Sequence, residues 1–511
     1  MRACFFEGHI RNRLQLCEEL SIDPASPQND ELSLLEAAFG LWGSDIGNHL
    51  RGSFSFAIMN ETNGELFCAR DPLGIEPFYY RLDVDGALRY GSDIETVVYG
   101  MERREIDLEA LQRYFMLGYP AGEKTLYDGV WKLMPGHYLI YDGTSILTRP
   151  YHTLSFSPDY SRNEAQWVAD IERTLDEILE EDAAALESGG SCAFLSSGVD
   201  SSYLLAKSGA KHAYSIGYAE ESSSEAREAA ATARQLGVEF SEVEIDSNQY
   251  FDAIPRVIHS AGMPLADAST VALLIGCESV ANDGSCCLSG EGADELFAGY
   301  HLYRRANTLG KTGGPWYFGC SRIMRAEDAQ RLLMLERSYP MENLVKGIYE
   351  ATESCEHLSR LQAIDCALFL EGDILLGAHA ASRASGLRLL LPYADQRMVT
   401  LAARIPASYK LREGCGKYVL RKAAQGKLPH EVAFRRKIGF SVPIRAWMRE
   451  PERMRDIESM LFDSDVSSLF DMRMVEAYWR SFVDGNEELW HIIYALYVFL
   501  IWYRECFTRR L

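Results

Sequence analysis

The sequence predicts a two-domain protein in which an α+β part precedes an α/β part. Residues 1–150 alternate short apolar runs with turn signals, as in GSFSFAIMN (52–60), and this pattern is typical of a β-rich sandwich. Further along the chain, strand-like runs alternate with helical stretches, which indicates βαβ units and a parallel sheet. From about residue 320 the pattern is mainly helical. We therefore expect a sandwich followed by a parallel-sheet domain with a helical carboxy-terminal part.

The boundary between the two predicted domains is a polar segment. Residues 151–163 are rich in Ser, Pro and Asp, and we interpret them as a linker between domain 1–150 and domain 164–511. Within the second domain the pattern predicts a helix over 223–236 and strands over 191–195, 212–217, 239–245 and 285–290.

Composition excludes several classes of function. The 511-residue chain has a formal net charge of -23, which argues against a nucleic-acid partner because binding to phosphates needs clustered Lys and Arg. The 12 cysteines lack CxxC spacing, so we expect free thiols in a cytoplasmic protein, and no apolar leader opens the sequence. The apolar run from Trp490 to Tyr503 is shorter than the roughly 20 residues of a membrane span, which predicts a buried helix and no membrane partner.

A loop of small residues, LSSGVDSS (195–202), follows the first predicted strand of the second domain and opens a helix. Small residues let the backbone approach a ligand, and free N–H groups at a helix start bind anions. The hydroxyls of Ser196, Ser201 and Ser202 could contact the same anion, and Asp200 could hold Mg²⁺ against phosphate oxygens. On this loop alone, an ordinary turn is an equally open interpretation.

A second loop, LSGEGADELFAGY (288–300), also follows a buried strand. Ligands of parallel sheets bind beyond the carboxyl ends of the strands, so both loops can converge on one site. Asp294 would supply a second oxygen ligand for Mg²⁺, and Glu291 is a candidate general base. The alternative is a solvated acidic turn, which the flanking apolar runs and the three glycines disfavour.

In order along the chain, these and other motifs resemble those of the asparagine synthetase family. The family's ATP loop SGGxDSS is matched by 196–202, with Ser197 in place of one glycine, and LSGEGxDExFxGY is matched by 288–300. Two later family motifs resemble GCGKYVLRKAA (414–424) and RRKIGFSVPIRAW (435–447). Because ARDPLGIEPFYY (69–80) resembles the amino-terminal half of the family, the resemblance covers nearly the whole chain.

The resemblance implies an Ntn-hydrolase-like first domain and a PP-loop ATP pyrophosphatase second domain. Such enzymes use ATP and Mg²⁺ to adenylate a carboxylate, here a small-molecule or peptide acid, and ammonia or an amine then displaces AMP. A homodimer is left open. The resemblance implies Glu291 and Lys437 as catalytic residues and Asp200 and Asp294 as metal ligands. It implies that ATP and pyrophosphate are bound by Leu195, Ser196, Gly198, Asp200, Ser201, Ser202, Ile216, Gly217, Ser289, Gly290 and Lys417. For Lys417, a solvated helix lysine is an equally open interpretation.

The first domain departs from the glutamine-using members of the family. Their mature chains begin with a nucleophilic Cys, whereas this sequence begins Met-Arg-Ala-Cys, and the usual head of the domain has no counterpart. Cys4 lies in an apolar run, so we expect it in a core strand. In the motif that the family writes NGEIYN, Glu7 replaces the Asn of the oxyanion hole and His9 replaces the Glu. Because an acid repels developing negative charge there, the domain is expected to be inactive.

A second departure lies in residues 374–395, where the family pattern is close to ILxKxDRxSMxxSLExRxPFLD. Ser382, Leu387, Pro392 and Asp395 persist, but five charged family positions are Gly377, His379, Ala380, Arg388 and Leu390 here. Fewer side chains remain to pair with the ammonium and second carboxylate of aspartate. We therefore expect an acid other than free aspartate; a compensated salt-bridge network is the alternative.

The resemblance leaves three functions to compare. The first is a specialised amide ligase, since relatives without a working glutaminase include β-lactam synthetases and lasso-peptide cyclases. Glu291 stands where β-lactam synthetases carry Tyr, so this loop is closer to that of asparagine synthetases. The second function is an asparagine synthetase proper, dependent on glutamine or ammonia. The third is a non-catalytic relative that keeps the fold, against which the acidic residues of the two loops argue.

Overall fold

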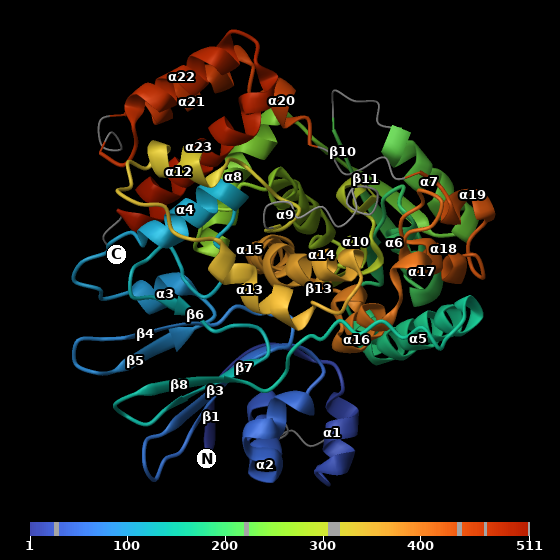
Figure 1. Cartoon of the computed structure of the whole chain (residues 1–511). Helices are drawn as coiled ribbons and strands as arrows, with labels where there is room; N and C mark the ends of the chain where they lie inside the picture. The colour runs from blue at the N-terminus through green and yellow to red at the C-terminus, as the bar shows by residue number, and fades with distance from the viewer. Residues whose placement is uncertain (25–29, 219–223, 305–316, 437–441, 464–467, 509–511) are drawn as a thin grey trace.

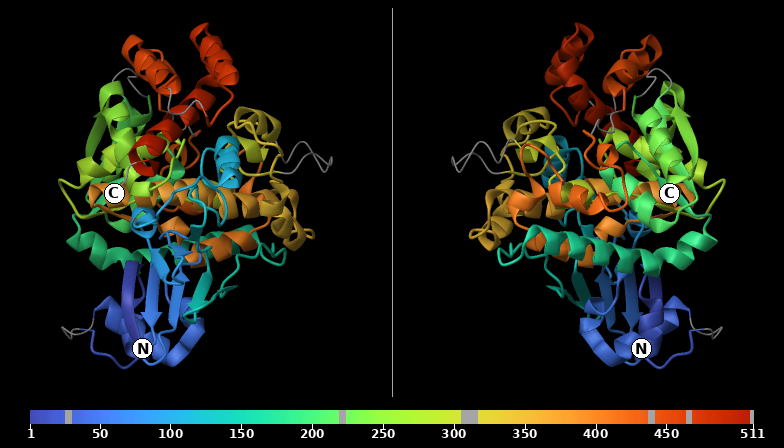
Figure 2. Two further views of the ribbon diagram at one scale, coloured as in Figure 1. Left: turned by 90° about the vertical axis from the view of Figure 1, so that its left-hand side faces the viewer. Right: turned by 90° about the vertical axis from the view of Figure 1, so that its right-hand side faces the viewer.

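The computed structural model of the chain describes residues 1–24, 30–218, 224–304, 317–436, 442–463 and 468–508. Most of the amino-terminal half lies at one end of the molecule, and the carboxy-terminal half lies at the other (Figures 1 and 2). Lys437 falls outside the described residues.

The amino-terminal half is built on two antiparallel sheets, as the alternating pattern predicts. Strands β2 and β3 lie inside the larger sheet and most of their side chains are buried, which explains their almost continuous apolar runs. The larger sheet has the order β1 (Arg2–Ile10), β2 (Gly52–Met59), β3 (Leu66–Arg70), β7 (His137–Tyr141) and β8 (Ile146–Pro150). The smaller sheet has the order β5 (Leu88–Gly91), β4 (Tyr79–Leu82) and β6 (Trp131–Lys132).

Four helices also belong to this half, and the alternating pattern did not predict them. Helices α1 (Arg13–Glu19) and α2 (Glu31–Trp42) contribute to an apolar core with strands of the larger sheet. The other two, α3 (Ile94–Val98) and α4 (Leu108–Leu117), share a core with the carboxy-terminal helices instead. The hydroxyl of Tyr114 on α4 donates to the carbonyl of Ala495 at 2.8 Å. The division at residue 150 is therefore not a clean division of the packing.

A five-stranded parallel sheet forms the centre of the second half. Its order is β11 (Glu239–Ile245), β10 (His212–Tyr218), β9 (Cys192–Phe194), β12 (Cys286–Leu288) and β13 (Arg388–Leu390). The four strands predicted from the sequence are confirmed, and β13 was not predicted. The sheet is connected through α6 (Val199–Ser208), α7 (Ser224–Leu236), α8 (Ser247–Ala261) and α9 (Ala268–Val280).

Helices make up most of the remaining described chain. The predicted buried helix is α23 (Trp490–Trp502), and every residue from Ile492 to Trp502 is buried. Within the described part of the chain, no helix is long and apolar enough to cross a membrane. The others are α5 (Glu164–Ser188), α10 (Ala293–Phe297), α12 (Ala326–Leu332), α13 (Glu342–Ala351), α14 (His357–Asp365), the π-helical η2 (Cys366–Leu375), α15 (Leu376–Ser385), α16 (Gln396–Arg404), α17 (Ala407–Lys410), α18 (Tyr418–Ala424), α19 (His430–Ala433), α20 (Ile444–Trp447), α21 (Pro451–Leu461), α22 (Met472–Val483) and the π-helical η6 (Tyr503–Phe507).

Buried ion pairs join the two halves. Arg11, directly after β1, pairs with Asp182 on α5 and with Asp395 before α16, each at 2.7 Å. Glu371 on η2 accepts from Arg70 at 3.0 Å and from Lys132 at 2.7 Å. The segment 151–163 packs along the second half. The backbone N–H groups of Ser157 and Asp159 donate to the carbonyls of Ala403 and Arg404 at the end of α16. All 12 cysteines are free, as predicted.

Candidate functional site

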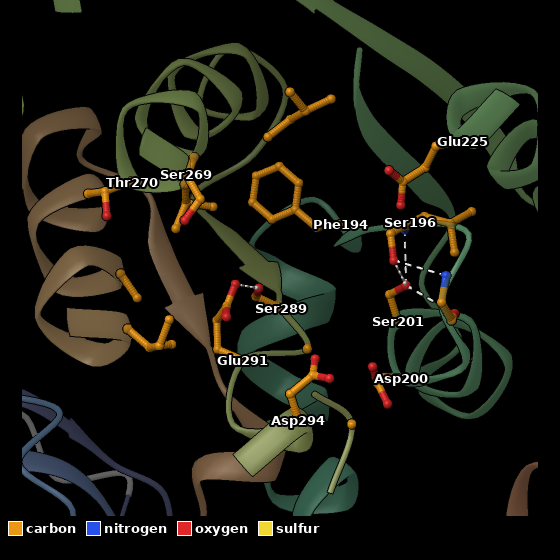
Figure 3. Close-up of a pocket in the computed structure, with 18 of the residues that line it drawn as sticks. Phe194, Ser196, Asp200, Ser201, Glu225, Ser269, Thr270, Ser289, Glu291 and Asp294 are labelled. Atoms are coloured by element: carbon orange, nitrogen blue, oxygen red, sulfur yellow. Dashed lines mark hydrogen bonds between the residues drawn. The ribbon is translucent and has the colours of Figure 1, made fainter. Parts of the chain in front are cut away.

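A cavity of about 530 Å³ opens at the carboxyl ends of the parallel strands. Both predicted loops line it, and they meet side by side: a Cβ on Gly290 would lie 3.5 Å from the Cβ of Asp200 and from the backbone nitrogen of Ser201. Figure 3 shows Asp294 between Glu291 and Asp200, with Ser196, Ser201 and Glu225 beyond. The convergence expected from the topology of a parallel sheet is present.

The first loop connects β9 to α6 and is held by its own serines. The backbone N–H of Ser196 donates to Ser201 Oγ at 3.0 Å, and the N–H of Gly198 donates to Ser196 Oγ at 3.1 Å. Ser202 is fully buried and its hydroxyl donates to the carbonyl of Gly198 at 2.8 Å. Ser197, which replaces a glycine of the family motif, does not itself line the cavity, and its hydroxyl donates at 3.2 Å to Glu225, which does.

The two aspartates of the site share one lysine. Lys417 is 2% exposed, and its Nζ contacts Asp294 Oδ1 at 2.9 Å and also pairs with Asp200 Oδ2. The open interpretation of Lys417 as a solvated helix lysine is therefore wrong. Asp200 Oδ1 is buried and has no hydrogen-bond partner among the described residues, so the carboxylate keeps an oxygen suited to a hard cation.

The opposite wall of the cavity comes from α9, η2 and α15. Ser269 and Thr270 begin α9, and Asp267 caps that helix by accepting from the backbone N–H of Ser269 at 2.9 Å. The wall is tight, since a Cβ on Gly377 would lie 2.6 Å from Thr270 Oγ1. Only apolar side chains reach the cavity from the other two helices: Phe369, Ile374 and Ala378.

Several charged or titratable residues of the segment 374–395 pair with the amino-terminal half instead. His379 pairs with Glu76 through Nδ1 at 3.1 Å, and Arg383 pairs with Asp93 at 2.6 Å. Arg388 is exposed on β13. The alternative of a structural salt-bridge network thus describes one side of this segment, while its other side is an apolar wall of the cavity.

Most of the predicted ligand-binding residues line the cavity. They are Leu195, Ser196, Gly198, Asp200, Ser201, Ile216, Ser289, Gly290, Glu291 and Asp294. Ser202, Gly217 and Lys417 do not line it. Ser202 holds the loop from behind, a Cβ on Gly217 would lie 2.2 Å from Glu242, and Lys417 pairs with Asp200 and Asp294, which do line the cavity. The roles of all these residues stay predictions, including that of Lys437, which is not described.

Several residues that sequence reasoning missed also line the cavity. Glu225, Thr270, Tyr300, Arg304 and Phe369 come from segments whose local pattern signals only a helix or its start. The sequence Asp267-Ala-Ser269 is recognisable as a helix cap, but capping does not reveal that the helix start faces a cavity. Tyr300 is the exception, since it ends the second motif.

A buried acid lies directly beneath the second loop. Glu295 is 1% exposed and accepts a hydrogen bond from the hydroxyl of Tyr300. Burial, helped by the neighbouring charge of Asp294, raises the pKa of Glu295 to about 8. At neutral pH this carboxyl is therefore largely protonated, which limits the negative charge around the two aspartates.

In the amino-terminal half, the motif around Gly8 lies on β1. Glu7 is exposed and lies opposite Ser55, and its carboxylate accepts a hydrogen bond from Ser92 at 3.5 Å. Burial, with Arg388 and Arg11 nearby, lowers the pKa of His9 to about 4, so this imidazole is neutral. Cys4 lies in a strand as predicted, but the expectation of a core position is wrong because its thiol is exposed. Residues of a strand alternate between faces, and an apolar run hides that alternation.

Comparison with known proteins agrees with this geometry. The family described as Asparagine synthase matches residues 175–504, and the one described as Glutamine amidotransferase domain matches residues 2–152. Asparagine synthetase [glutamine-hydrolyzing] 1 of Bacillus subtilis is 28% identical over 98% of this chain and 84% of its own length. A putative asparagine synthetase [glutamine-hydrolyzing] of Mycobacterium tuberculosis is 28% identical over 98% and 83%.

A solved structure, the glutamine-dependent NAD⁺ synthetase of Acinetobacter baumannii in complex with ADP, is 14% identical with a TM-score of 0.21; the match covers 69% of this chain and 88% of that chain. That score is too low to support an argument about this chain. The family match, in contrast, covers most of the sequence and contains both loops of the cavity. The chain belongs to the asparagine synthase family.

Proposed function

We propose that the protein is an ATP-dependent amide ligase that forms AMP and pyrophosphate. It adenylates a carboxylate other than free aspartate and couples it to ammonia or an amine. The observation that supports this most strongly is the meeting of Asp200, Asp294 and Lys417 beside a loop of small residues at the carboxyl end of a parallel sheet. Positioning and neutralisation of charge are what phosphoryl chemistry requires from a protein.

The residues of the two loops divide the chemistry between them. The backbone N–H groups and hydroxyls of residues 196–202 would bind the polyphosphate, with the start of α6 favouring its negative charge. The substrate carboxylate would attack the α-phosphorus, and the bond to pyrophosphate would break. Glu291, which faces the cavity, would then take the proton from the attacking amine as AMP leaves.

Asp200 and Asp294 are the residues that fit Mg²⁺, because they offer carboxylate oxygens on both loops and Asp200 Oδ1 is buried without a partner in the described chain. When bound, this ion would neutralise charge on the phosphate oxygens. Mg²⁺ commonly uses one or two carboxylates together with substrate phosphates, which is the donor set available here.

The apolar part of the wall, which comes from η2 and α15, supports an acid other than free aspartate. Free aspartate carries an ammonium and a second carboxylate besides the group that reacts, and burying either without a partner is costly. Phe369, Ile374 and Ala378 offer neither charge nor hydrogen bonds, and the segment's His379 and Arg383 are paired elsewhere. An acid whose carboxylate is carried by an uncharged small molecule or peptide suits this wall better.

The direct test compares free aspartate with its blocked form, N-acetyl-aspartate amide, in an ATP–pyrophosphate exchange assay. The two acids share the side-chain carboxylate and differ in the charges that the wall would have to accept. We expect exchange with the blocked form to exceed exchange with aspartate, and Asp200→Asn to abolish both. A higher rate of exchange with free aspartate than with the blocked form would favour an asparagine synthetase proper, as the names of the relatives suggest. Binding of ATP without exchange for any acid would favour a non-catalytic relative.

We further propose that the amino-terminal half has no glutaminase activity. The exposed carboxylate of Glu7 and the neutral imidazole of His9 occupy the motif that forms the oxyanion hole in the family. Glutamine alone should yield no glutamate above a boiled-protein control, while ammonia or an amine supports synthesis. Release of glutamate by the purified protein at a rate comparable with synthesis would contradict this proposal.

A further inference from the structure

The pairing of Lys417 with both aspartates has a consequence for the order in which ligands bind. Its ammonium contacts Asp294 Oδ1 at 2.9 Å and also pairs with Asp200, so the lysine occupies the position between the two carboxylates. Those carboxylates are the best candidates for holding Mg²⁺. A divalent cation between them would have to displace or crowd a buried positive charge.

The position of Lys417 is built into the backbone. The residue has a left-handed conformation, with φ of 58°, and its N–H donates to the carbonyl of Phe297 at 2.9 Å. Such a conformation is uncommon for a side chain other than Gly and persists where surrounding contacts hold it. Gly299 leaves room for the lysine, because a Cβ there would lie 2.2 Å from Lys417 Cε and 1.8 Å from Asp294 Oδ1.

We propose that Lys417 is a built-in counter-ion that keeps the metal site closed to free divalent cations until a polyphosphate arrives. This inference rests on the proposed ATP-dependent function. A buried ammonium that loses both carboxylates would be left without a partner, which is strongly unfavourable. The oxygens of a polyphosphate supply new negative charge, so the lysine can pair with phosphate while the aspartates become available to the metal. Lys417 is thus a positioning residue for ordered binding.

The test is a titration with Mn²⁺, a paramagnetic probe for Mg²⁺, in which free ion is measured by electron paramagnetic resonance. The wild-type protein should bind Mn²⁺ at this site only in the presence of ATP. Lys417→Met removes the counter-ion and should bind Mn²⁺ without nucleotide at least ten-fold more tightly than the wild type does. The double variant Lys417→Met/Asp200→Asn should lose this gain, which separates the site from other acidic surface. Lys427→Met, an exposed lysine beyond the carboxyl end of α18, is the matched control.

Lys417→Gln, whose amide can still donate to a carboxylate, replaces Lys417→Met if the latter does not fold. Two results would overturn the inference: wild-type binding of Mn²⁺ without nucleotide that Asp200→Asn abolishes, or no gain in the folded Lys417 variants. Failure of the proposed function looks different. It would appear as wild-type protein that gains no Mn²⁺ site with ATP and forms no adenylate, while the Lys417 variants still gain the nucleotide-free site.

Discussion

Glu291 is the residue whose proposed role can be separated from that of its neighbours. It lines the cavity on the second loop, where its carboxylate accepts a hydrogen bond from the Ser289 hydroxyl at 3.5 Å, and we propose that it acts in the second half of the reaction. We expect Glu291→Gln to keep ATP–pyrophosphate exchange within a few fold of wild type, because activation of the acid does not need a base. Formation of the amide should fall by about 100-fold or more, since general bases commonly contribute that much. Parallel assays of exchange and of product from one preparation check this, and equal loss of both would contradict the assignment.

Glu295 makes a prediction about pH. Its pKa is raised from 4.5 to about 8 by burial, so between these pH values the folded protein holds a proton that the unfolded chain releases. The contribution of Glu295 to stability therefore falls as the pH rises from about 4.5 to 8, by a few kcal/mol. Glu295→Gln keeps an acceptor for the Tyr300 hydroxyl but does not ionise. Its stability relative to wild type, measured by urea unfolding at pH 5, 7 and 8.5, should rise with pH; a constant difference would mean that Glu295 is ionised in the folded state.

The π-helical element η2 carries one of the buried acids that join the two halves. Glu371 is 2% exposed and pairs with Arg70 and Lys132 from the amino-terminal half. Burial alone would raise the pKa of this carboxyl, but the two neighbouring cations outweigh that effect and lower the pKa. Glu371→Gln would leave buried positive charge without a partner and should lower the free energy of unfolding by about 3–5 kcal/mol. Glu350→Gln, an exposed acid on α13, is the control and should change it by less than about 0.5 kcal/mol. Equal effects in urea unfolding would refute the structural role of this contact.

At the scale of elements, the sequence predicts strands better than the helices that frame the cavity. The runs SCAFL and EFSEVEI are apolar or alternating over short lengths between turn signals, and they form β9 and β11. Strand β13 was not predicted because Arg388–Leu390 is only three residues long and follows a helix whose apolar pattern continues into it. Helices α1 and α2 were not predicted because turn signals between short apolar runs suggest a purely β-rich domain.

The same limit applies to the candidate site. The two loops could be found because small residues and acids stand at fixed spacing after a strand. Thr270 and Phe369 could not be found, since each lies on an apolar helix, and only the tertiary arrangement, in which α15 packs against both α9 and η2, places them at the cavity. Nor does any local pattern show that Lys417 is buried between Asp200 and Asp294, residues distant in the chain.

Across the whole molecule, buried ion pairs and a shared apolar core join the two halves in addition to the linker. Arg11 reaches α5 and the start of α16, Glu371 reaches the small sheet, and α4 shares a core with α23. These contacts explain how an amino-terminal half without glutaminase activity would still serve the protein, because the opposite side of the cavity wall rests on it. His379 and Arg383 on α15 make that contact through Glu76 and Asp93.

We propose that a single cavity adenylates a carboxylate with ATP. The most direct measurement is acid-dependent exchange of labelled pyrophosphate into ATP by the full chain, with Asp200→Asn and the exposed control Asp252→Asn measured beside it. We predict exchange for the wild type and for Asp252→Asn, with AMP as the nucleotide product when an amine is added, and a loss of about 100-fold or more for Asp200→Asn. Formation of ADP and phosphate in place of AMP and pyrophosphate, or exchange that Asp200→Asn leaves intact, would contradict it.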